Sequence, residues 1–209
     1  MTELTQFKPV IIGIRGFFQS GKDTIAAIFE ETFNKDNYDV DVRSFAHNLR
    51  IAIMKIFGFN YTYVFSEEFK TDLHDINPIG QPDKKMTGRE LLQYFGTEVC
   101  RAMSRDCWSH SCINEIRCDD IGVAIVKDVR FLTEVQAIRN SGNPSFIIRV
   151  ERPGHNGDGH QSERELADAS GIDDFVIQND GSIEDLKKKV QQVYKEIRKR
   201  INATNESVS

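Results

Sequence analysis

The amino-acid sequence predicts a three-layer α/β/α fold built on a parallel sheet of five strands. Short apolar runs alternate along the chain with segments of helical periodicity, which is the order of parallel strands and their crossover helices. Several runs are apolar at nearly every position, as in strands buried on both faces. With 209 residues, 39% of them hydrophobic, the chain is long enough for one sizeable core. We therefore expect a single domain, residues 1–209, with the first strand at the centre of the sheet.

The first strand and the first helix have the clearest patterns. Residues 9–15, PVIIGIR, form an apolar run that ends in a glycine-rich loop. The segment that follows, DTIAAIFEETF, has the periodicity of an amphipathic helix. Its apolar face comprises Ile25, Ile28, Phe29 and Phe33.

A second strand and a second helix come next. Residues 39–45 alternate between apolar and polar side chains, which predicts a strand. A helix is expected at 47–57, with Leu49, Ile53 and Ile56 as its apolar stripe.

In the middle of the chain, the sequence pattern changes at Met86 from loop-like to helical. Proline and glycine mark loops within residues 59–85, where we expect an irregular connection. From Met86 to Arg117 the pattern is mostly helical, in two pieces broken near Asp106.

The last part of the chain returns to alternating strands and helices. GVAIVKD, PSFIIRVE and DFVIQND are strand signals, and a helix is expected at 131–141 between the first two. Ser182 is placed to cap the final amphipathic helix. The polar, glycine-rich RPGHNGDGHQSE is expected to be a surface loop, and residues 201–209 a disordered tail.

Composition excludes several classes of function. A net charge of −5 and a pI near 5.6 give no overall electrostatic attraction for nucleic acid. No apolar run is long enough to cross a bilayer, and MTELTQF has no features of a signal peptide. The four cysteines contain no C-x-x-C pair, so we expect buried thiols rather than a metal cluster or disulfides. These features predict a cytoplasmic protein that binds neither membranes nor nucleic acid.

Residues 16–24, GFFQSGKDT, match the phosphate-loop pattern G-x-x-x-x-G-K. A strand ends directly in this loop and a helix begins directly after it, which is the context that the motif requires. Backbone N–H groups in such a loop bind phosphate, and Lys22 adds a charge for the β- and γ-phosphates. The residues expected to bind ATP are Gly16, Ser20, Gly21, Lys22, Asp23 and Thr24.

Asp23 departs from the pattern, because Ser or Thr usually follows the lysine and contacts Mg²⁺. G-K-D-T resembles the G-K-G-T of adenylate-kinase-type enzymes, in which water mediates most metal contacts. Asp128 ends the strand GVAIVKD, as a metal-binding carboxylate would. We therefore expect Mg²⁺ with ATP, held through water by Asp23, Thr24 and Asp128. The alternatives are that Asp23 only stabilises the helix N-terminus and that Asp128 caps the next helix.

Two arginines are placed to meet a phosphate or an acceptor. Arg130 follows Asp128 by two residues at the carboxyl edge of the sheet. Arg50 lies on the helix after the second strand, where adenylate-kinase-like enzymes carry an arginine for the acceptor phosphate. A solvated helix arginine is the alternative for Arg50.

Four blocks of the sequence resemble the bacteriophage deoxynucleoside monophosphate kinases, a family with the phosphate-loop kinase fold. They are GFFQSGKDT, GRELLQYFGTEVCR, KDVRFLTEVQAIRNSG, and a stretch from RVERPG to VIQNDGSIEDL. Together they run from about residue 9 to residue 190. The phosphate loop is common to many families, whereas the third and fourth blocks in this order are more specific.

The resemblance implies a nucleoside monophosphate kinase-like architecture and an ATP-dependent transfer to a deoxynucleoside monophosphate. It implies a helical acceptor-binding region at about 46–120 and a lid-like loop at 152–164, and it allows a homodimer. The expected catalytic residues are Lys22, Arg89, Asp128 and Arg130. The expected substrate-binding residues are Arg15, Arg50, Arg89, Arg130 and Glu134. The expected lid residues are Arg152, His160 and Arg164.

Two other functions stay open at the level of sequence. Dephospho-coenzyme A kinase and phosphomevalonate kinase share the loop and the sheet, and residues 59–85 match the deoxynucleotide kinases poorly. A nucleotide-binding module without turnover is the other alternative. Such a module would be expected to keep Ser or Thr after Lys22.

Overall fold

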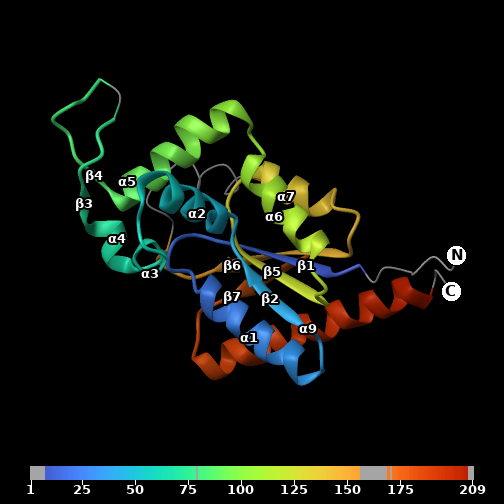
Figure 1. Ribbon diagram of the computed structural model, residues 1–209. Coiled ribbons are helices and arrows are strands. Elements are labelled where there is room, and N and C mark those ends of the chain that lie inside the picture. The colour runs from blue at the N-terminus through green and yellow to red at the C-terminus, as the bar shows by residue number, and fades with distance from the viewer. Residues whose placement is uncertain (1–7, 79, 156–168, 170, 207–209) are drawn as a thin grey trace, which may run out of the picture. The chain divides into compact units, whose positions relative to one another are not determined.

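The computed structural model describes residues 8–78, 80–155, 169 and 171–206 (Figure 1). They form two compact units: a sheet unit within 1–44 and 112–209, and a helical unit of 45–111. The helical unit corresponds to most of the acceptor-binding region predicted at 46–120.

The sheet unit is built on five parallel strands in the order β2-β5-β1-β6-β7. Both the five-stranded parallel sheet and the central position of the first strand are therefore confirmed. The carboxyl ends of parallel strands meet at one edge, where ligands bind in open α/β sheets. The strands are β1 (Val10–Arg15), β2 (Val40–Arg43), β5 (Val123–Val129), β6 (Ser145–Glu151) and β7 (Phe175–Gln178).

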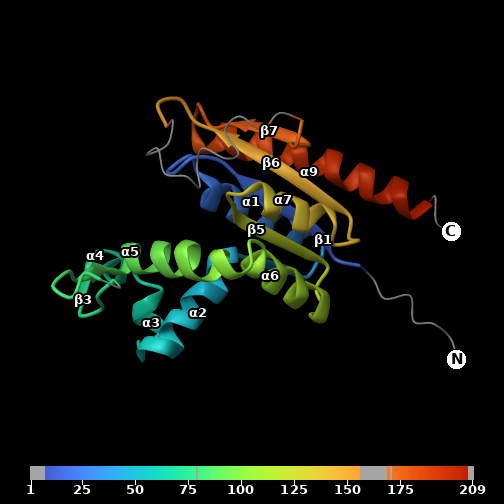
Figure 2. The ribbon, with the colours of Figure 1, turned by 90° about the horizontal axis from the view of Figure 1, so that it is seen from above.

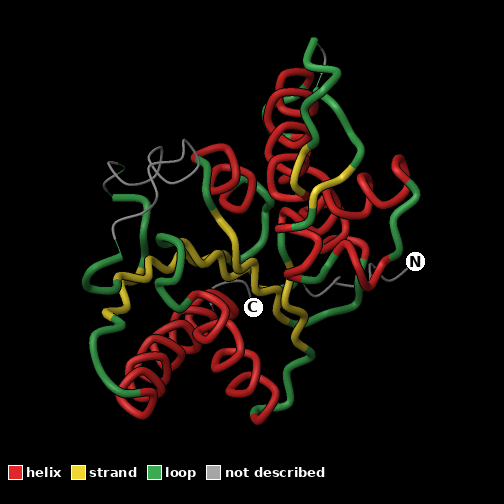
Figure 3. Tube along the Cα trace, turned by 90° about the vertical axis from the view of Figure 1, so that its left-hand side faces the viewer, coloured by secondary structure: helices red, strands yellow, loops and turns green. Residues whose placement is uncertain are grey.

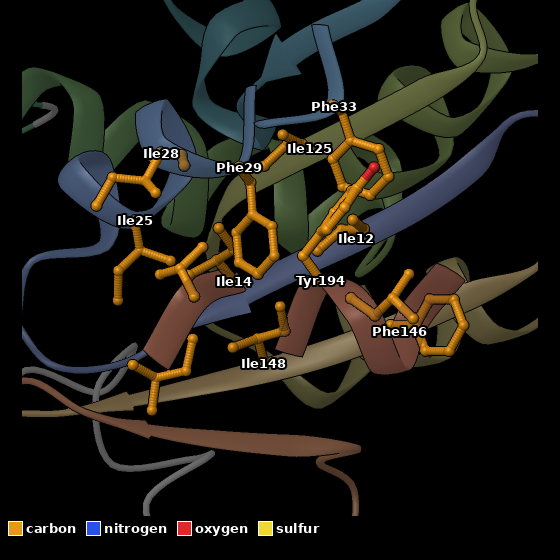
Figure 4. Packing of buried hydrophobic residues seen from close by; sticks show 14 of the residues in the cluster. Ile12, Ile14, Ile25, Ile28, Phe29, Phe33, Ile125, Phe146, Ile148 and Tyr194 are labelled. Atoms are coloured by element: carbon orange, nitrogen blue, oxygen red, sulfur yellow. The ribbon is translucent and has the colours of Figure 1, made fainter. Parts of the chain in front are cut away.

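One face of the sheet is covered by α1 (Lys22–Lys35) and α9 (Ile183–Glu206), which lie side by side beneath the strands in Figure 3. In Figure 2, α9 runs along the sheet beside β6 and β7. Ring centroids of Phe33 and Tyr194, one from each helix, are 4.7 Å apart in an edge-to-face arrangement. Figure 4 shows these rings with the strand side chains that they cover. All four apolar residues predicted on the first helix are buried.

The opposite face of the sheet is covered by α7 (Leu132–Arg139) and the second half of α6 (Cys107–Cys118). Gly13 permits the close approach of α7, because a Cβ there would lie 2.8 Å from side-chain atoms of Ile138 and Ile147. Arg117 on α6 donates a hydrogen bond to the carbonyl of Ser141. Burial on both faces explains why β1 and most of β5 and β6 are continuous apolar runs.

The last helix begins as predicted and ends later than predicted. Ser182 caps it, since its hydroxyl accepts a hydrogen bond from the backbone N–H of Asp185 at 3.2 Å. The helix extends to Glu206, so the prediction of a disordered tail is wrong for residues 201–206. Ile201 is buried and continues the apolar stripe past the polar sequence that suggested a tail. The stripe comprises Leu186, Val190, Tyr194, Ile197 and Ile201.

The helical unit has more regular structure than the sequence predicted for residues 59–85. Two short helices and one strand lie in this stretch, and the strand pairs antiparallel with a second one that begins at Met86. The break near Asp106 is confirmed, and the segment before it includes a π-helix. The elements are α2 (Phe45–Phe57), α3 (Tyr61–Val64), α4 (Glu67–Thr71), β3 (Leu73–His74), β4 (Met86–Thr87), α5 (Gly88–Gln93), η1 (Tyr94–Arg101) and the start of α6.

The core of the helical unit corrects the stripe predicted for α2. Ile53 is fully buried in a cluster with Val64, Phe69 and Leu91, but Ile56 is 58% exposed. The chain turns directly after α2, and Phe59 packs against the cluster.

Burial of the cysteines is only partly as expected. All four are free thiols, but only Cys112 is buried, and Cys118 is exposed. Within the described ranges, no helix is long and apolar enough to cross a membrane.

Candidate active site

The loop between β1 and α1 has a backbone that requires glycine at two positions. Gly16 and Gly21 have φ values of +151° and +101°. A Cβ at Gly16 would lie 2.5 Å from the carbonyl oxygen of Val150, and one at Gly21 would collide with Asn179. Gly21 is the N-cap of α1, and no side chain caps the helix there. The loop thus leads into a helix N-terminus whose N–H groups and dipole suit a phosphate.

Ser20 lies inside this loop and is 1% exposed. Its hydroxyl is buried and has no hydrogen-bond partner within the described part of the chain. The backbone carbonyl of Ser20 accepts a hydrogen bond from Asn179 at 2.8 Å, which fixes the loop against the end of β7. A buried hydroxyl without a partner is costly unless a ligand satisfies it, so the loop fits a phosphate oxygen.

Lys22 folds back over the loop that precedes it. Its ammonium group donates hydrogen bonds to the carbonyls of Gly16 and Phe17, both at 2.7 Å. Arg152, predicted as a lid residue, also contacts the loop, through the carbonyl of Gln19 at 3.1 Å. Two cations therefore lie on the loop. The other predicted lid residues, His160 and Arg164, lie outside the described residues.

The end of β5 presents charged groups to two neighbours. Lys127 forms an ion pair with Asp23 of α1, with 2.6 Å between Nζ and Oδ1. Asp128 accepts a hydrogen bond at 2.6 Å from the hydroxyl of Ser44, which follows the neighbouring strand β2. Thr24 is exposed in the first turn of α1. The predicted metal-binding residues thus lie at the carboxyl edge of the sheet unit.

Glu134 holds the turn that carries Arg130. It is 2% exposed, and its Oε2 accepts hydrogen bonds from the backbone N–H groups of Arg130 at 2.6 Å and Phe131 at 3.0 Å. The carboxylate therefore fixes the backbone from which the exposed Arg130 side chain projects. The predicted role of Glu134 in binding substrate stays a prediction.

Arg15, immediately before the loop, is buried and paired. Its Nε and Nη2 contact the two carboxylate oxygens of Asp173 at 2.5 and 2.6 Å. The bidentate pair ties the end of β1 to the segment before β7. Because its fork is occupied by Asp173, Arg15 is better placed to support the loop than to bind a substrate.

Arg50 and Arg89 belong to the helical unit. The Arg50 guanidinium donates to the carbonyl of Val64 and lies 5.5 Å from the ring centre of Phe65. Arg89 is exposed in the first turn of α5. Thr87 fixes that turn, because it forms a capping box with Glu90.

Sequence reasoning missed four residues around the loop, namely Ser44, Lys127, Asp173 and Asn179. Ser44, Lys127 and Asn179 lie at or near the carboxyl ends of strands, whereas Asp173 precedes β7. The order of the strands, which the sequence does not state, brings each of them to its partner.

A family model for deoxynucleotide monophosphate kinases matches residues 47–190, well over half of the chain. The chain belongs to this family. It is therefore a small-molecule kinase, a transferase that binds nucleotides, as the resemblance implied. The matched segment begins after the phosphate loop, so the loop geometry is an independent observation. A five-stranded parallel sheet with this loop after its central strand is the predicted phosphate-loop kinase fold.

No curated protein matches the sequence. Among solved structures, the kinase is similar to the Mycobacterium tuberculosis APS kinase in complex with AMPPNP and APS. That match has 16% identity and a TM-score of 0.46, and covers 90% of this chain and 98% of the other. It is also similar to the dephospho-CoA kinase from Campylobacter jejuni, with 14% identity, a TM-score of 0.46, and coverage of 91% and 97%. These distant likenesses assign no substrate.

Proposed function

We propose that this kinase transfers the γ-phosphoryl group of ATP to a deoxynucleoside monophosphate, giving ADP and the deoxynucleoside diphosphate. The reaction would serve deoxynucleotide biosynthesis. The single observation that carries the proposal is the match of residues 47–190 to the deoxynucleotide monophosphate kinase family. The phosphate loop at residues 16–24, outside the matched segment, supports ATP as the donor.

The donor side of the proposal rests on the loop. Gly16 and Gly21 give the loop its backbone conformation, the buried hydroxyl of Ser20 donates to a phosphate oxygen, and Lys22 supplies a positive charge. These groups are preorganised by the backbone, so little reorganisation is needed when ATP binds.

Magnesium bound to the ATP phosphates would neutralise charge that develops during transfer. We assign Asp128 and Thr24, with Asp23, to hold the ion through water. The described residues contain no group of three His, Cys, Asp or Glu side chains that would hold a metal by themselves. That observation is consistent with an ion whose ligands are mainly phosphate oxygens and water.

On the acceptor side, we assign Arg130 of the sheet unit to stabilising the charge of the transition state. For Arg50 and Arg89 of the helical unit, binding of the acceptor phosphate rests on the family resemblance alone. Glu134 presents Arg130 by fixing its backbone. No strong general base is required, because the acceptor phosphate is already an anion at neutral pH. Arg152, which contacts the loop through Gln19, would lie close to the phosphates and help to exclude water.

The proposal is tested by ADP release from ATP and Mg²⁺ against a panel of acceptors. The panel holds dTMP, dGMP, dCMP, dAMP, their ribonucleotide forms and dephospho-coenzyme A, and the Lys22→Ala variant is the blank. Turnover on deoxynucleotides that disappears in the blank is the expected result. Turnover on dephospho-coenzyme A alone would contradict the proposal and make the protein a dephospho-coenzyme A kinase, an alternative that the sequence left open.

A further inference from the structure

An ion pair joins the first turn of α1 to the end of β5. Asp23 follows the phosphate-loop lysine, and Lys127 precedes Asp128 on the neighbouring strand. We propose that Lys127 is a further positioning residue of the ATP site, which acts by neutralising the carboxylate of Asp23. The inference rests on the proposed function, since it takes the loop as the ATP phosphate site.

The carboxylate of Asp23 creates an electrostatic problem at this position. A negative charge in the first turn of a helix is stabilised by the same N–H groups and dipole that attract phosphate. An aspartate there therefore competes with ATP for the helix N-terminus and repels the phosphates directly. The serine or threonine of the usual motif carries no such charge.

Lys127 reaches Asp23 because of the alternation of side chains along β5. Val123 and Ile125 point to the face that α1 covers, and both are completely buried in the core. Lys127 is the next residue in this series, at the point where the pairing of β5 with β1 shifts register, and its ammonium group contacts Asp23 at the N-terminus of α1. The next residue, Asp128, contacts Ser44 instead.

The pair is suited to adjusting charge rather than to stabilising the fold. The side chains of Lys127 and Asp23 are 38% and 82% exposed, and ion pairs this exposed contribute little to folding. Next to a ligand with several negative charges, however, the difference between a neutral pair and a lone carboxylate changes the affinity for that ligand.

The test is a double-mutant cycle on ATP binding, measured by calorimetry at low ionic strength with EDTA present. Without metal, any role of Asp23 in holding Mg²⁺ is silent and only its charge is measured. We expect Lys127→Met to weaken ATP binding about fivefold or more. Asp23→Asn should strengthen it, because Lys127 is then released toward the phosphates. The double variant should bind within about twofold of the wild type.

Two controls separate this role from a structural one. Lys127→Arg keeps the charge and should retain wild-type affinity. Lys35→Met breaks the exposed Lys35–Glu31 pair at the other end of the same helix and should leave ATP affinity unchanged. The Lys127→Met effect should also shrink in 0.5 M salt, where exposed charges are screened.

Unchanged affinity in Lys127→Met would overturn the inference, as would a double variant as weak as Lys127→Met itself. The second result would mean that Lys127 contacts the phosphates rather than acting through Asp23. If the wild-type protein bound no ATP, the proposed function would fail and this inference with it. If the wild-type protein bound ATP and all three variants of the cycle bound it equally well, this inference would fail and the proposed function would stand.

Discussion

The hydroxyl of Ser44 donates a hydrogen bond to Oδ2 of Asp128 at 2.6 Å. The two residues are 84 positions apart in the chain, yet β2 and β5 are hydrogen-bonded neighbours, so their carboxyl ends coincide. The contact fixes the rotamer of the carboxylate that we assign to the Mg²⁺ shell. It thereby links the order of the strands to the geometry proposed for catalysis.

Ser44→Ala should raise the Mg²⁺ concentration needed for half-maximal activity and lower kcat about tenfold, because a hydrogen bond to a charged group is lost. Titrating Mg²⁺ at saturating ATP measures both quantities. Ser182→Ala is the matched control, since Ser182 also donates to an aspartate, Asp185, but at the start of α9. Equal magnesium dependence in Ser44→Ala and the wild type would remove Ser44 from the site.

Ser20→Ala should change stability and binding in opposite directions. Its buried hydroxyl has no partner among the described residues, so removing it should leave the free protein as stable or about 1 kcal/mol more stable. ATP binding should weaken, because the proposed phosphate contact is lost. Thermal unfolding with and without ATP checks both effects. A variant that loses stability without ATP yet binds it normally would mean that the hydroxyl serves the fold alone.

Arg15→Met should destabilise the fold by about 3 kcal/mol, because Asp173, which is 10% exposed, loses its bidentate partner and keeps only the longer contact with Arg149 at 3.4 Å. Urea unfolding measures this loss. The matched double variant Arg15→Met/Asp173→Asn should recover part of the loss by removing the carboxylate charge that has lost its bidentate partner. If Arg15 instead bound substrate, Arg15→Met would keep its stability and lose turnover.

Stability should fall as the pH rises from about 9 to about 12, because burial raises the pKa of the Cys112 thiol from 9.0 to about 12. In this window the unfolded chain has lost the proton and the folded chain retains it, so deprotonation favours unfolding. The slope approaches about 1.4 kcal/mol per pH unit for one such group. Urea unfolding at pH 8 and pH 10 should show a smaller loss for Cys112→Ala than for the wild type. Equal losses of stability in Cys112→Ala and the wild type would mean that the Cys112 thiol does not contribute to the pH dependence.

The sheet and the loop were predictable because their signals are local. Strands buried on both faces are apolar throughout, and the loop has a fixed glycine spacing between a strand and a helix. Ile56 was misplaced because a helical stripe does not reveal where the chain turns back, as it does at Phe59. The polar residues after Ile201 suggested a disordered tail, although the apolar stripe of the last helix continues to Ile201.

The residues of the site were predictable only where they belong to one continuous segment of the sequence. Gly16 to Thr24 form a continuous stretch, and Asp128 ends an evident strand. Lys127 stands next to Asp128, but its partner Asp23 is 104 residues away and is reached only through the pairing of β1 with β5. In the same way, the order of the strands brings Asn179 to the carbonyl of Ser20 in the loop. It also brings Asp173 to Arg15. The sequence also does not show that the carboxylate of Glu134 is buried and accepts a hydrogen bond from the backbone of Arg130.

The most direct test follows the phosphoryl group itself. ATP labelled in the γ-phosphate is incubated with Mg²⁺, the kinase and a deoxynucleoside monophosphate, and the products are separated by chromatography. We predict that the label appears in the deoxynucleoside diphosphate in an amount equal to the ADP formed, and that Lys22→Ala abolishes it. Label found in inorganic phosphate, with no labelled diphosphate for any deoxynucleotide, would contradict the proposed function.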